Sequence, residues 1–368
     1  MKKRNRFFIT TIVVSVLILF LTYGCEKEKE PVIIGISAGY AHSFVITSDG
    51  TLWGWGYNTS GQLGDGTSEN QLSPVQVGTD FMAASAGGSH TMALKYDGTL
   101  WAWGANTEGQ VGDGTVENRN TPVQTGTGFK RISAGNTHSL ALTSEDSLYV
   151  WGDNDYYQLG DGTRSDRTIP YSSGYSFTGI SAGRIISLAL KDDGTLWTWG
   201  WDGQGEIGDG IDENNSSPVQ ISSDFVAIAS GHYHYLGIKQ DGSLWAWGYN
   251  DYGQLGDGTY TTSTTPVQVG SGFIAVAAGW AHSLGLKSDG SLWAWGWNAS
   301  GQLGDGSILN QTQPVFVGYS YNFISAGGAH SMAVKTDGTL WVWGENQGGQ
   351  LGDGSTTDSY LPKQIELP

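Results

Sequence analysis

The chain contains 368 residues, of which 57 are glycine, 16 are tryptophan and one is cysteine, and its formal net charge is −17. Glycine at roughly twice its usual share of about 7% would destabilise helix interiors, which argues against a helical bundle. Only nine prolines occur and no Gly-X-Y period exists, which excludes collagen. Because an acidic surface repels a phosphate backbone, we expect no nucleic-acid partner. A tryptophan-rich β protein with glycines at defined positions remains.

The N-terminal segment has the pattern of an export signal. Four basic side chains precede an apolar run from Phe7 to Leu21, and the only cysteine, Cys25, follows. This order predicts a lipoprotein-type signal peptide over residues 1–24, and a lipidated Cys25 with a charged spacer over residues 25–31. The body would then be exported and anchored at a bacterial cell envelope, on the outer membrane or the cell surface. An uncleaved membrane anchor is the alternative, although the apolar run is short for a membrane span.

Residues 32–368 repeat with a period of 48 residues. Two marker positions recur seven times at this interval: Gly39, Gly87, Gly135, Gly183, Gly231, Gly279 and Gly327, and Pro74, Pro122, Pro170, Pro218, Pro266, Pro314 and Pro362. Propeller blades have periods of about 40 to 50 residues. The period therefore predicts one domain in which each repeat forms one blade.

Each repeat is expected to contain four short strands. In repeat six, residues 273–278 and 282–287 form the first two, and the tight turn at Asp289-Gly290 leads into residues 292–296. This third strand alternates Trp with Leu or Ala, so both of its faces are apolar, as a blade packed between two neighbours requires. A long loop then precedes Pro314, and because proline suits a sheet edge, we expect the fourth strand to be outermost. The fold class is therefore an all-β seven-bladed propeller with four antiparallel strands per blade.

The repeated motifs resemble the regulator of chromosome condensation repeat. The segments that carry the resemblance are Ser-Ala-Gly-x-x-His-Ser at 37–43, Asp-Gly-Thr-Leu-Trp-x-Trp-Gly at 49–56 and Asn-x-x-Gly-Gln-Leu-Gly at 58–64. The resemblance covers residues 32–368 and implies a seven-bladed propeller. The family includes exchange factors, chromatin binders, a plant photoreceptor and secreted bacterial β-lactamase inhibitors, so the fold does not determine the function.

Most side chains that could carry chemistry recur once per blade, which favours structural roles. The paired Trp columns that begin at Trp53 and Trp55 suit blade packing better than light sensing. Six histidines share the column of His42, and equivalent positions in a ring are too far apart for a metal, so we expect structural hydrogen bonds. The aspartates of the Gly-Asp-Gly segments, beginning at Asp65, match no calcium loop and are expected to fix the loop. We therefore expect no metal site and no cofactor.

The residues that vary between repeats point to a binding face. In a four-stranded blade, the turn after strand one and the loop after strand three lie on the same face of the disc. Aromatic, acidic and basic side chains vary at these positions on an otherwise constant scaffold, a pattern typical of binding surfaces. The candidate binding residues are Tyr40, Tyr57, Tyr156, Tyr157, Arg184, Trp201, Asp202, Glu206, His232, Tyr233, Tyr249, Tyr252, Trp280 and Trp297.

Repeat four departs furthest from the pattern. Arg184-Ile185-Ile186 replaces the segment that ends in histidine, and Asp202 and Glu206 replace the usual Asn and Gln. The two acids are the best candidates for a carboxylate pair on the shared face, which could serve glycoside chemistry at a suitable separation. Drift in one of seven copies explains the same change, and no nucleophile arrangement can be placed.

The sequence thus predicts a non-enzymatic, monomeric binding propeller that recognises a protein or peptide through its aromatic loops. The alternative is a carbohydrate-binding or glycan-processing module, because Trp and Tyr rings also stack on sugars. Contact with the membrane is expected only through the N-terminal lipid.

Overall fold

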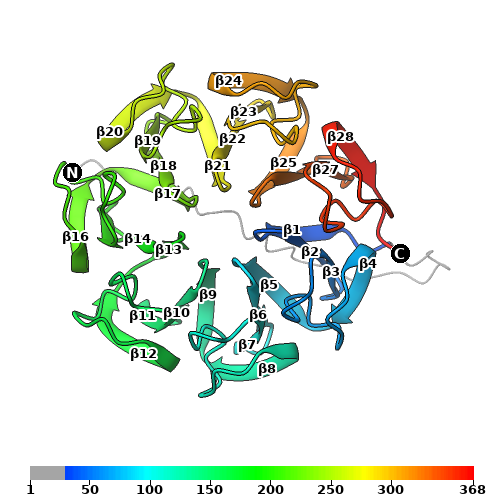
Figure 1. The fold of residues 1–368 in the computed structure, drawn as a ribbon, viewed down its shortest axis with the longest axis horizontal. Helices are drawn as coiled ribbons and strands as arrows, with labels where there is room; N and C mark the ends of the chain where they lie inside the picture. Colours follow the sequence, from blue (N-terminus) through cyan, green and yellow to red (C-terminus); the bar gives the residue numbers. More distant parts are fainter. Residues whose placement is uncertain (1–29) are drawn as a thin grey trace, which may run out of the picture.

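A computed structural model describes residues 30–368, which form seven four-stranded antiparallel sheets arranged in a ring (Figure 1). In every sheet the strands are ordered as they occur in the chain, so each repeat is one blade. The structure confirms the prediction of an all-β seven-bladed propeller with four antiparallel strands per blade.

The blades are numbered here as the repeats. Blade 1 contains β1 (Ile33–Ala38), β2 (His42–Thr47), β3 (Leu52–Gly56) and β4 (Gln71–Gly78), and blade 2 contains β5 (Phe81–Ala86), β6 (His90–Lys95), β7 (Thr99–Gly104) and β8 (Arg119–Thr127). Blade 3 contains β9 (Phe129–Ala134), β10 (His138–Thr143), β11 (Ser147–Gly152) and β12 (Arg167–Ser176), and blade 4 contains β13 (Gly179–Ala182), β14 (Ile186–Leu190), β15 (Leu196–Gly200) and β16 (Asn215–Ser222). Blade 5 contains β17 (Phe225–Ser230), β18 (His234–Lys239), β19 (Leu244–Gly248) and β20 (Ser263–Gly270), and blade 6 contains β21 (Phe273–Ala278), β22 (His282–Lys287), β23 (Leu292–Gly296) and β24 (Gln311–Gly318). Blade 7 contains β25 (Tyr321–Ala326), β26 (His330–Lys335), β27 (Leu340–Gly344) and β28 (Ser359–Ile365).

The first strand of each blade lines the centre of the ring and the fourth forms the outer edge (Figure 1). A small central cavity of about 110 Å³ is bounded by the C-terminal ends of the first strands and the glycines that follow them. The outermost strand contains the marker proline, as expected, because a proline cannot donate a hydrogen bond within a sheet.

The apolar core lies between neighbouring blades. The second Trp of each third strand is fully buried, and each hydrophobic cluster combines side chains from two adjacent blades. The cluster that closes the ring joins Val45 and Trp55 of blade 1 to Met332 and Val342 of blade 7. The first and last blades therefore meet through packed side chains, and no strand is exchanged between them.

Each loop after strand three also extends to the next blade. The amide of Gly66 in blade 1 donates to the carbonyl of Asn120 in blade 2 at 2.8 Å, and Gly354 of blade 7 makes the same contact with Leu72 of blade 1. Both glycines have positive φ, of 85° and 78°, which other L-residues rarely adopt. The glycine spacing thus serves the contacts between blades as well as the turns.

Repeat three shows how strict these backbone requirements are. Asp146 replaces the hairpin glycine and Tyr157 replaces a loop glycine, yet they keep φ values of 67° and 65°. The scaffold therefore imposes the left-handed conformation on a tyrosine, at a cost of about 1 kcal/mol or more.

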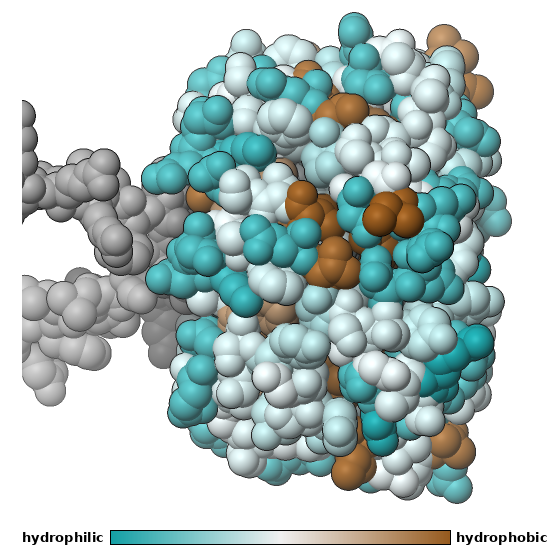
Figure 2. Space-filling model, turned by 90° about the vertical axis from the view of Figure 1, so that its left-hand side faces the viewer, coloured by the Kyte–Doolittle hydropathy of each residue, from teal (hydrophilic) through white to brown (hydrophobic). Residues whose placement is uncertain are grey.

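The disc edge shown in Figure 2 is mostly hydrophilic or neutral, and its apolar side chains form small separate patches. Ile169 and Ile211 are among the exposed apolar residues of blades 3 and 4. Single exposed apolar residues are normal on protein surfaces. The outer edge in this view therefore offers no continuous apolar belt.

The predicted signal peptide and Cys25 lie outside the described residues. Within residues 30–368, no helix is long and apolar enough to cross a membrane.

Candidate functional site

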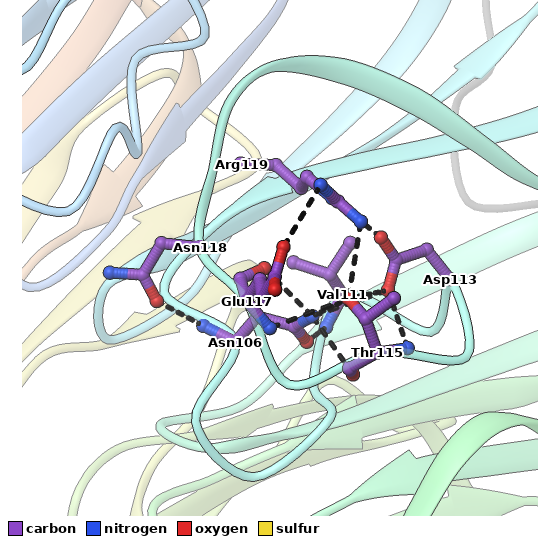
Figure 3. A network of polar contacts seen from close by, with 7 residues as sticks. All are labelled: Asn106, Val111, Asp113, Thr115, Glu117, Asn118 and Arg119. Carbon is purple, nitrogen blue, oxygen red and sulfur yellow. Dashed lines mark hydrogen bonds and ion pairs between the residues drawn. The ribbon is translucent and has the colours of Figure 1, made fainter.

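The loop after strand three is held by a polar network that recurs around the ring. In blade 2, the Asn106 carboxamide accepts from the amide of Val111 at 2.9 Å and donates to Asp113 Oδ1 at 3.2 Å and to the Thr115 carbonyl at 3.0 Å (Figure 3). Asp113 also accepts from the amide of Thr115 at 2.9 Å and from Arg119 Nε at 2.6 Å. The structure thus confirms that the Gly-Asp-Gly aspartates fix the loop.

These hydrogen bonds also set the charge of the loop. Burial alone would raise the pKa of Asp113, but the bonds from Thr115 and Arg119 hold it below its ordinary value. The regular loop therefore presents its variable side chains from a base that an ionised aspartate and its hydrogen bonds hold in place.

The histidine column connects adjacent blades. His90 Nε2 lies 3.0 Å from Ser139 Oγ, and the Ser139 hydroxyl donates to the Gln110 carbonyl at 2.8 Å. Because that hydroxyl proton is already used, Ser139 accepts from His90, which places the histidine proton on Nε2. Burial lowers the pKa of His90 to about 3, so the ring is neutral. Structural hydrogen bonds were predicted for this column, and six such pairs occur in residues 30–368: His42–Thr91, His90–Ser139, His138–Ser187, His234–Ser283, His282–Ser331 and His330–Ser43.

The boundary between blades 4 and 5 lacks this pair. Ile186 takes the histidine position and Tyr235 takes the serine position, and both side chains are fully buried in one apolar cluster. The two changes match each other, because Ile186 and Tyr235 pack together in the same apolar cluster. The Tyr235 hydroxyl has no hydrogen-bond partner within the described residues. An apolar contact thus replaces a polar one at this boundary.

Asp202 and Glu206, predicted as a carboxylate pair on the shared face, are buried inside the blade 4 loop, which corrects the expectation that they could act on a ligand there. Their exposed fractions are 2% and 0%, because they occupy the buried positions of the Asn and Gln in the regular loop. Asp202 Oδ1 accepts from the amide of Ile207 at 3.1 Å, and Glu206 Oε2 accepts from the amide of Gln204 at 2.7 Å. Burial raises the pKa of Asp202 to about 6 and that of Glu206 to about 7. The two acids therefore support the loop by accepting hydrogen bonds from its backbone amides.

Above this loop, aromatic side chains from three consecutive blades meet. Trp201 of blade 4, Tyr233, Tyr249 and Tyr252 of blade 5 and Trp280 of blade 6 line one cavity of about 240 Å³ together with Gln204 and Ala281. We call this cavity the aromatic pocket. Its lining combines turns after strand one with loops after strand three, which confirms that these two segments share a face.

The rings of the aromatic pocket contact one another mainly edge to face. Centroid distances are 6.3 Å between Trp201 and Tyr233, 6.1 Å between Tyr233 and Tyr249 and 6.0 Å between Tyr252 and Trp280. The corresponding planes are inclined by 63°, 68° and 42°. Trp297 lies behind Trp280, at 5.0 Å and 79°. Such contacts fix each ring, so the pocket is preformed.

The pocket borders the mouth of the central cavity. His232 lies 6.3 Å from Trp280 and stacks at 5.9 Å on Tyr40, which comes from blade 1. The Arg184 guanidinium lies 4.8 Å from the centre of the Tyr233 ring. Burial, together with the nearby Arg184 charge, lowers the pKa of His232 to about 3. Arg184 is therefore the positive charge of this region.

Three predicted binding residues lie apart from the pocket. Tyr57 and Tyr156 are exposed in the loops of blades 1 and 3, and Tyr157 packs under the Arg164 guanidinium at 5.5 Å. None of the three lines the aromatic pocket. Within residues 30–368, no group of three His, Cys, Asp or Glu side chains is placed to hold a metal ion.

The sequence prediction missed Gln204, Ala281 and Asp251. Gln204 and Ala281 line the aromatic pocket, and Asp251 accepts a hydrogen bond from the Tyr249 hydroxyl at 2.9 Å. Asp251 could have been found from its place between Tyr249 and Tyr252 in a variable loop. Burial and the Asp251 bond raise the pKa of Tyr249 to about 12, so this phenol stays neutral.

Comparison with known proteins shows the family. The model of the RCC1-like domain matches residues 16–226 and 176–368, and the chain therefore belongs to the RCC1-like domain family. Segments of 52 residues are 48% identical to the Ultraviolet-B receptor UVR8 of Arabidopsis thaliana and 38% identical to the Protein RCC2 homolog of Danio rerio. These segments span 14% of the chain and only 12% and 10% of those relatives.

Solved structures share the fold at low sequence identity. Human WBSCR16 has a TM-score of 0.79 at 24% identity, over 87% of this chain and 94% of that one. Prp20p from Saccharomyces cerevisiae has a TM-score of 0.78 at 24% identity, over 88% and 87% of the two chains. The CRINKLY WD40 ectodomain of the Arabidopsis thaliana receptor kinase ACR4 has a TM-score of 0.55 at 19% identity, over 92% and 100%. The family and the propeller are thus established.

Proposed function

We propose that this propeller is a non-enzymatic binding protein that holds a protein or peptide partner on the face bearing the aromatic pocket. One observation carries the proposal: five aromatic side chains from three blades line a single preformed cavity. Buried Trp and Tyr anchors dominate the binding energy of protein interfaces, and rigid rings lose little entropy on binding. The blade 5 loop that supplies Tyr249 and Tyr252 is fixed by the bonds from the Asn250 carboxamide to the Thr259 and Thr261 carbonyls, which lowers the entropic cost further.

The corrected position of Asp202 and Glu206 supports a binding role over catalysis. Neither carboxyl group reaches the surface, and both accept hydrogen bonds from their own loop. Their place is that of a structural Asn and Gln in the other blades. The proposal therefore includes no catalytic step.

Structural relatives support a protein partner. The structure of Prp20p was described together with its binding to Gsp1p and histones, and yeast RCC1 was crystallised with Kap60 bound. Both share the propeller fold with this chain, at TM-scores of 0.78 and 0.77. A rigid disc with variable loops suits this use, and we extend it to the present chain as a monomer.

The proposal retains an anchor at the cell envelope through a lipid on Cys25. If Cys25 is the anchor, a Cys25→Ala protein will leave the membrane fraction and lack the mass of the lipid. Equal membrane association of the variant would favour the uncleaved apolar segment instead.

Selection from a random peptide library tests the binding face. Wild type should enrich peptides that the triple variant Trp201→Ala, Trp280→Ala, Trp297→Ala no longer retains. We expect at least a tenfold loss, because the variant removes two pocket anchors of about 1 to 2 kcal/mol each and the ring that packs against Trp280. Tyr96→Ala with Tyr319→Ala is the matched control, since these tyrosines are 58% and 62% exposed in connections on the opposite face.

The control should bind like wild type, and thermal melting should show that the triple variant is folded. Equal enrichment by a folded triple variant would overturn the proposed face. A glycan array run on the same proteins tests the alternative, and glycan binding lost in the triple variant would favour the carbohydrate module.

A further inference from the structure

The orientation of the rings limits what the aromatic pocket can hold. Trp201, Tyr233, Tyr249, Tyr252 and Trp280 present their faces in different directions, with neighbouring planes inclined by 42° to 71°. A flat sugar or base needs one broad ring to lie against. Rings inclined in this way surround a compact group instead.

The size of the cavity points the same way. Pockets that enclose a drug-sized molecule typically have about 300–1,000 Å³, whereas this one has about 240 Å³. It is therefore suited to one side chain or one head group. A larger ligand would place only its tip inside.

The charge around the aromatic pocket is mainly negative. Asp251 accepts from the Tyr249 hydroxyl at the rim, and the loop that supplies Trp201 and Gln204 contains Asp202 and Glu206 beneath its surface. Arg184, which lies 4.8 Å from the centre of the Tyr233 ring and does not line the pocket, is the opposing charge. The chain as a whole carries a net charge of −17. A ring face is also negative, so five rings add to the attraction for a cation.

We propose that the aromatic pocket binds a compact alkylammonium cation, of the kind carried by a lysine side chain or its methylated forms, presented by the partner. The inference rests on the proposed function and names the chemistry of the group that this face recognises. Such a cation would lie against the ring faces, with Asp251 balancing its charge and the Gln204 carboxamide available as an acceptor. One ring of the pocket already binds a cation, because the Arg184 guanidinium lies 4.8 Å from the centre of the Tyr233 ring.

A pair of probes that differ only in charge tests this inference. Choline carries a quaternary ammonium group, and 3,3-dimethylbutan-1-ol has the same shape with a neutral carbon in place of the nitrogen. Titration followed by the indole NMR signals of Trp201 and Trp280 should show choline binding at least fivefold more tightly, and weakening in high salt. Equal or tighter binding of the alcohol would mean that the pocket recognises shape alone, and would overturn the inference. Absence of choline binding would overturn it as well.

Two surface charges give opposite and specific effects. Asp251→Asn should weaken choline binding about threefold, and Arg184→Gln should strengthen it about threefold, because each changes one charge near the pocket. Both variants should leave binding of the neutral alcohol unchanged. Matching effects on choline and the alcohol would show a change of pocket shape and count against the inference.

The peptide selection separates failure of this inference from failure of the proposed function. Enriched peptides that need Trp280 but contain no essential lysine or arginine would retain the binding face and reject the cation. Replacement of an essential lysine by norleucine, which keeps the alkyl stem, should cost at least fivefold in affinity if the cation is recognised.

Discussion

The loops after strand three of blades 2 and 4 occupy equivalent positions, but different hydrogen bonds hold their backbones. In blade 2 the Asn106 carboxamide donates to Asp113, Thr115 and the Glu117 carbonyl. In blade 4 the equivalent Asp202 carboxylate has no N–H group to donate, and its Oδ2 atom has no hydrogen-bond partner among residues 30–368. Its neighbour Asp209 also carries a like charge. The backbone path is nevertheless kept, because Asp202 still accepts from the amide of Ile207. The hydrogen bond that this side chain accepts is thus enough to keep the backbone path of the loop. The bonds that an Asn also donates stabilise the loop further.

The contacts that blades 2 and 4 make with their next blades differ in the same way, because blade 4 again lacks polar contacts that blade 2 has. His90 and Ser139 connect blades 2 and 3, whereas Ile186 faces Tyr235 between blades 4 and 5. At the cavity mouth, backbone amides donate to the next blade at six positions within residues 30–368, and Arg184 does not. Blades 4 and 5 also supply four of the five rings of the aromatic pocket. The region thus lacks polar contacts that the other boundaries have, at the place where we propose a binding surface, and such a trade-off is common at functional sites.

The largest effect is expected from the blade 4 and 5 boundary. Tyr235→Ser should destabilise the protein by about 3 kcal/mol or more, because it leaves a cavity in place of a fully buried ring. Adding Ile186→His should recover about 1 to 2 kcal/mol by restoring the pair seen at the other boundaries. Urea denaturation measures both. Strictly additive effects would show that the two positions are not coupled.

Exchanging Asn and Asp at the equivalent loop positions 106 and 202 is expected to change the free energy of unfolding by an intermediate amount. Asn106→Asp should cost about 2–3 kcal/mol at pH 8, because it removes the donor bonds and buries a charge. Asp202→Asn should stabilise by about 1–2 kcal/mol, since it restores a donor beside Asp209 and removes a like charge. Differential scanning calorimetry compares the pair. Destabilisation by Asp202→Asn would mean that the blade 4 loop has adapted to its acid.

The pH dependence gives an effect of similar or smaller size. Glu206 has a pKa of about 7 in the folded protein and an ordinary value of 4.5, so the folded state binds more protons between these values. The ionisation of Glu206 therefore lowers the free energy of unfolding as the pH rises from 4.5 to 7. Glu206→Gln should stabilise by about 2 kcal/mol at pH 8 and have no effect on this account below pH 4.5. Urea midpoints across this range provide the measurement.

Glu117→Gln is the matched control for that measurement, because the Glu117 side chain is 79% exposed. It should leave the pH profile unchanged. A Glu206→Gln profile parallel to that of wild type from pH 4.5 to 7.5 would contradict the burial of an ionisable group at this position.

Much of the structure was readable from the chain. The strict 48-residue period, the apolar alternation of the third strand and the Asp-Gly turns depend on contacts that every blade repeats, so they predicted the propeller and its outer strand. The roles of His42 and Asp65 were also predictable, because a residue present in nearly every blade serves the blade. The variable loops indicated the face on which the aromatic pocket lies, because only residues that differ between blades are free of a role in the scaffold.

The order of residues in the chain determined by itself that the many glycines and tryptophans recur every 48 residues and build an acidic propeller scaffold. Only the tertiary structure decided that Trp201, Tyr233, Tyr249, Tyr252 and Trp280, up to 79 positions apart, line one pocket while Tyr57 and Tyr156 do not. It also showed that the side chains of Asp202 and Glu206 are buried within the blade 4 loop. The physical reason is that the local sequence pattern indicates which face of the disc a strand or turn lies on. A pocket depends instead on the directions of side chains from different blades, which neither strand register nor the repeat period determines.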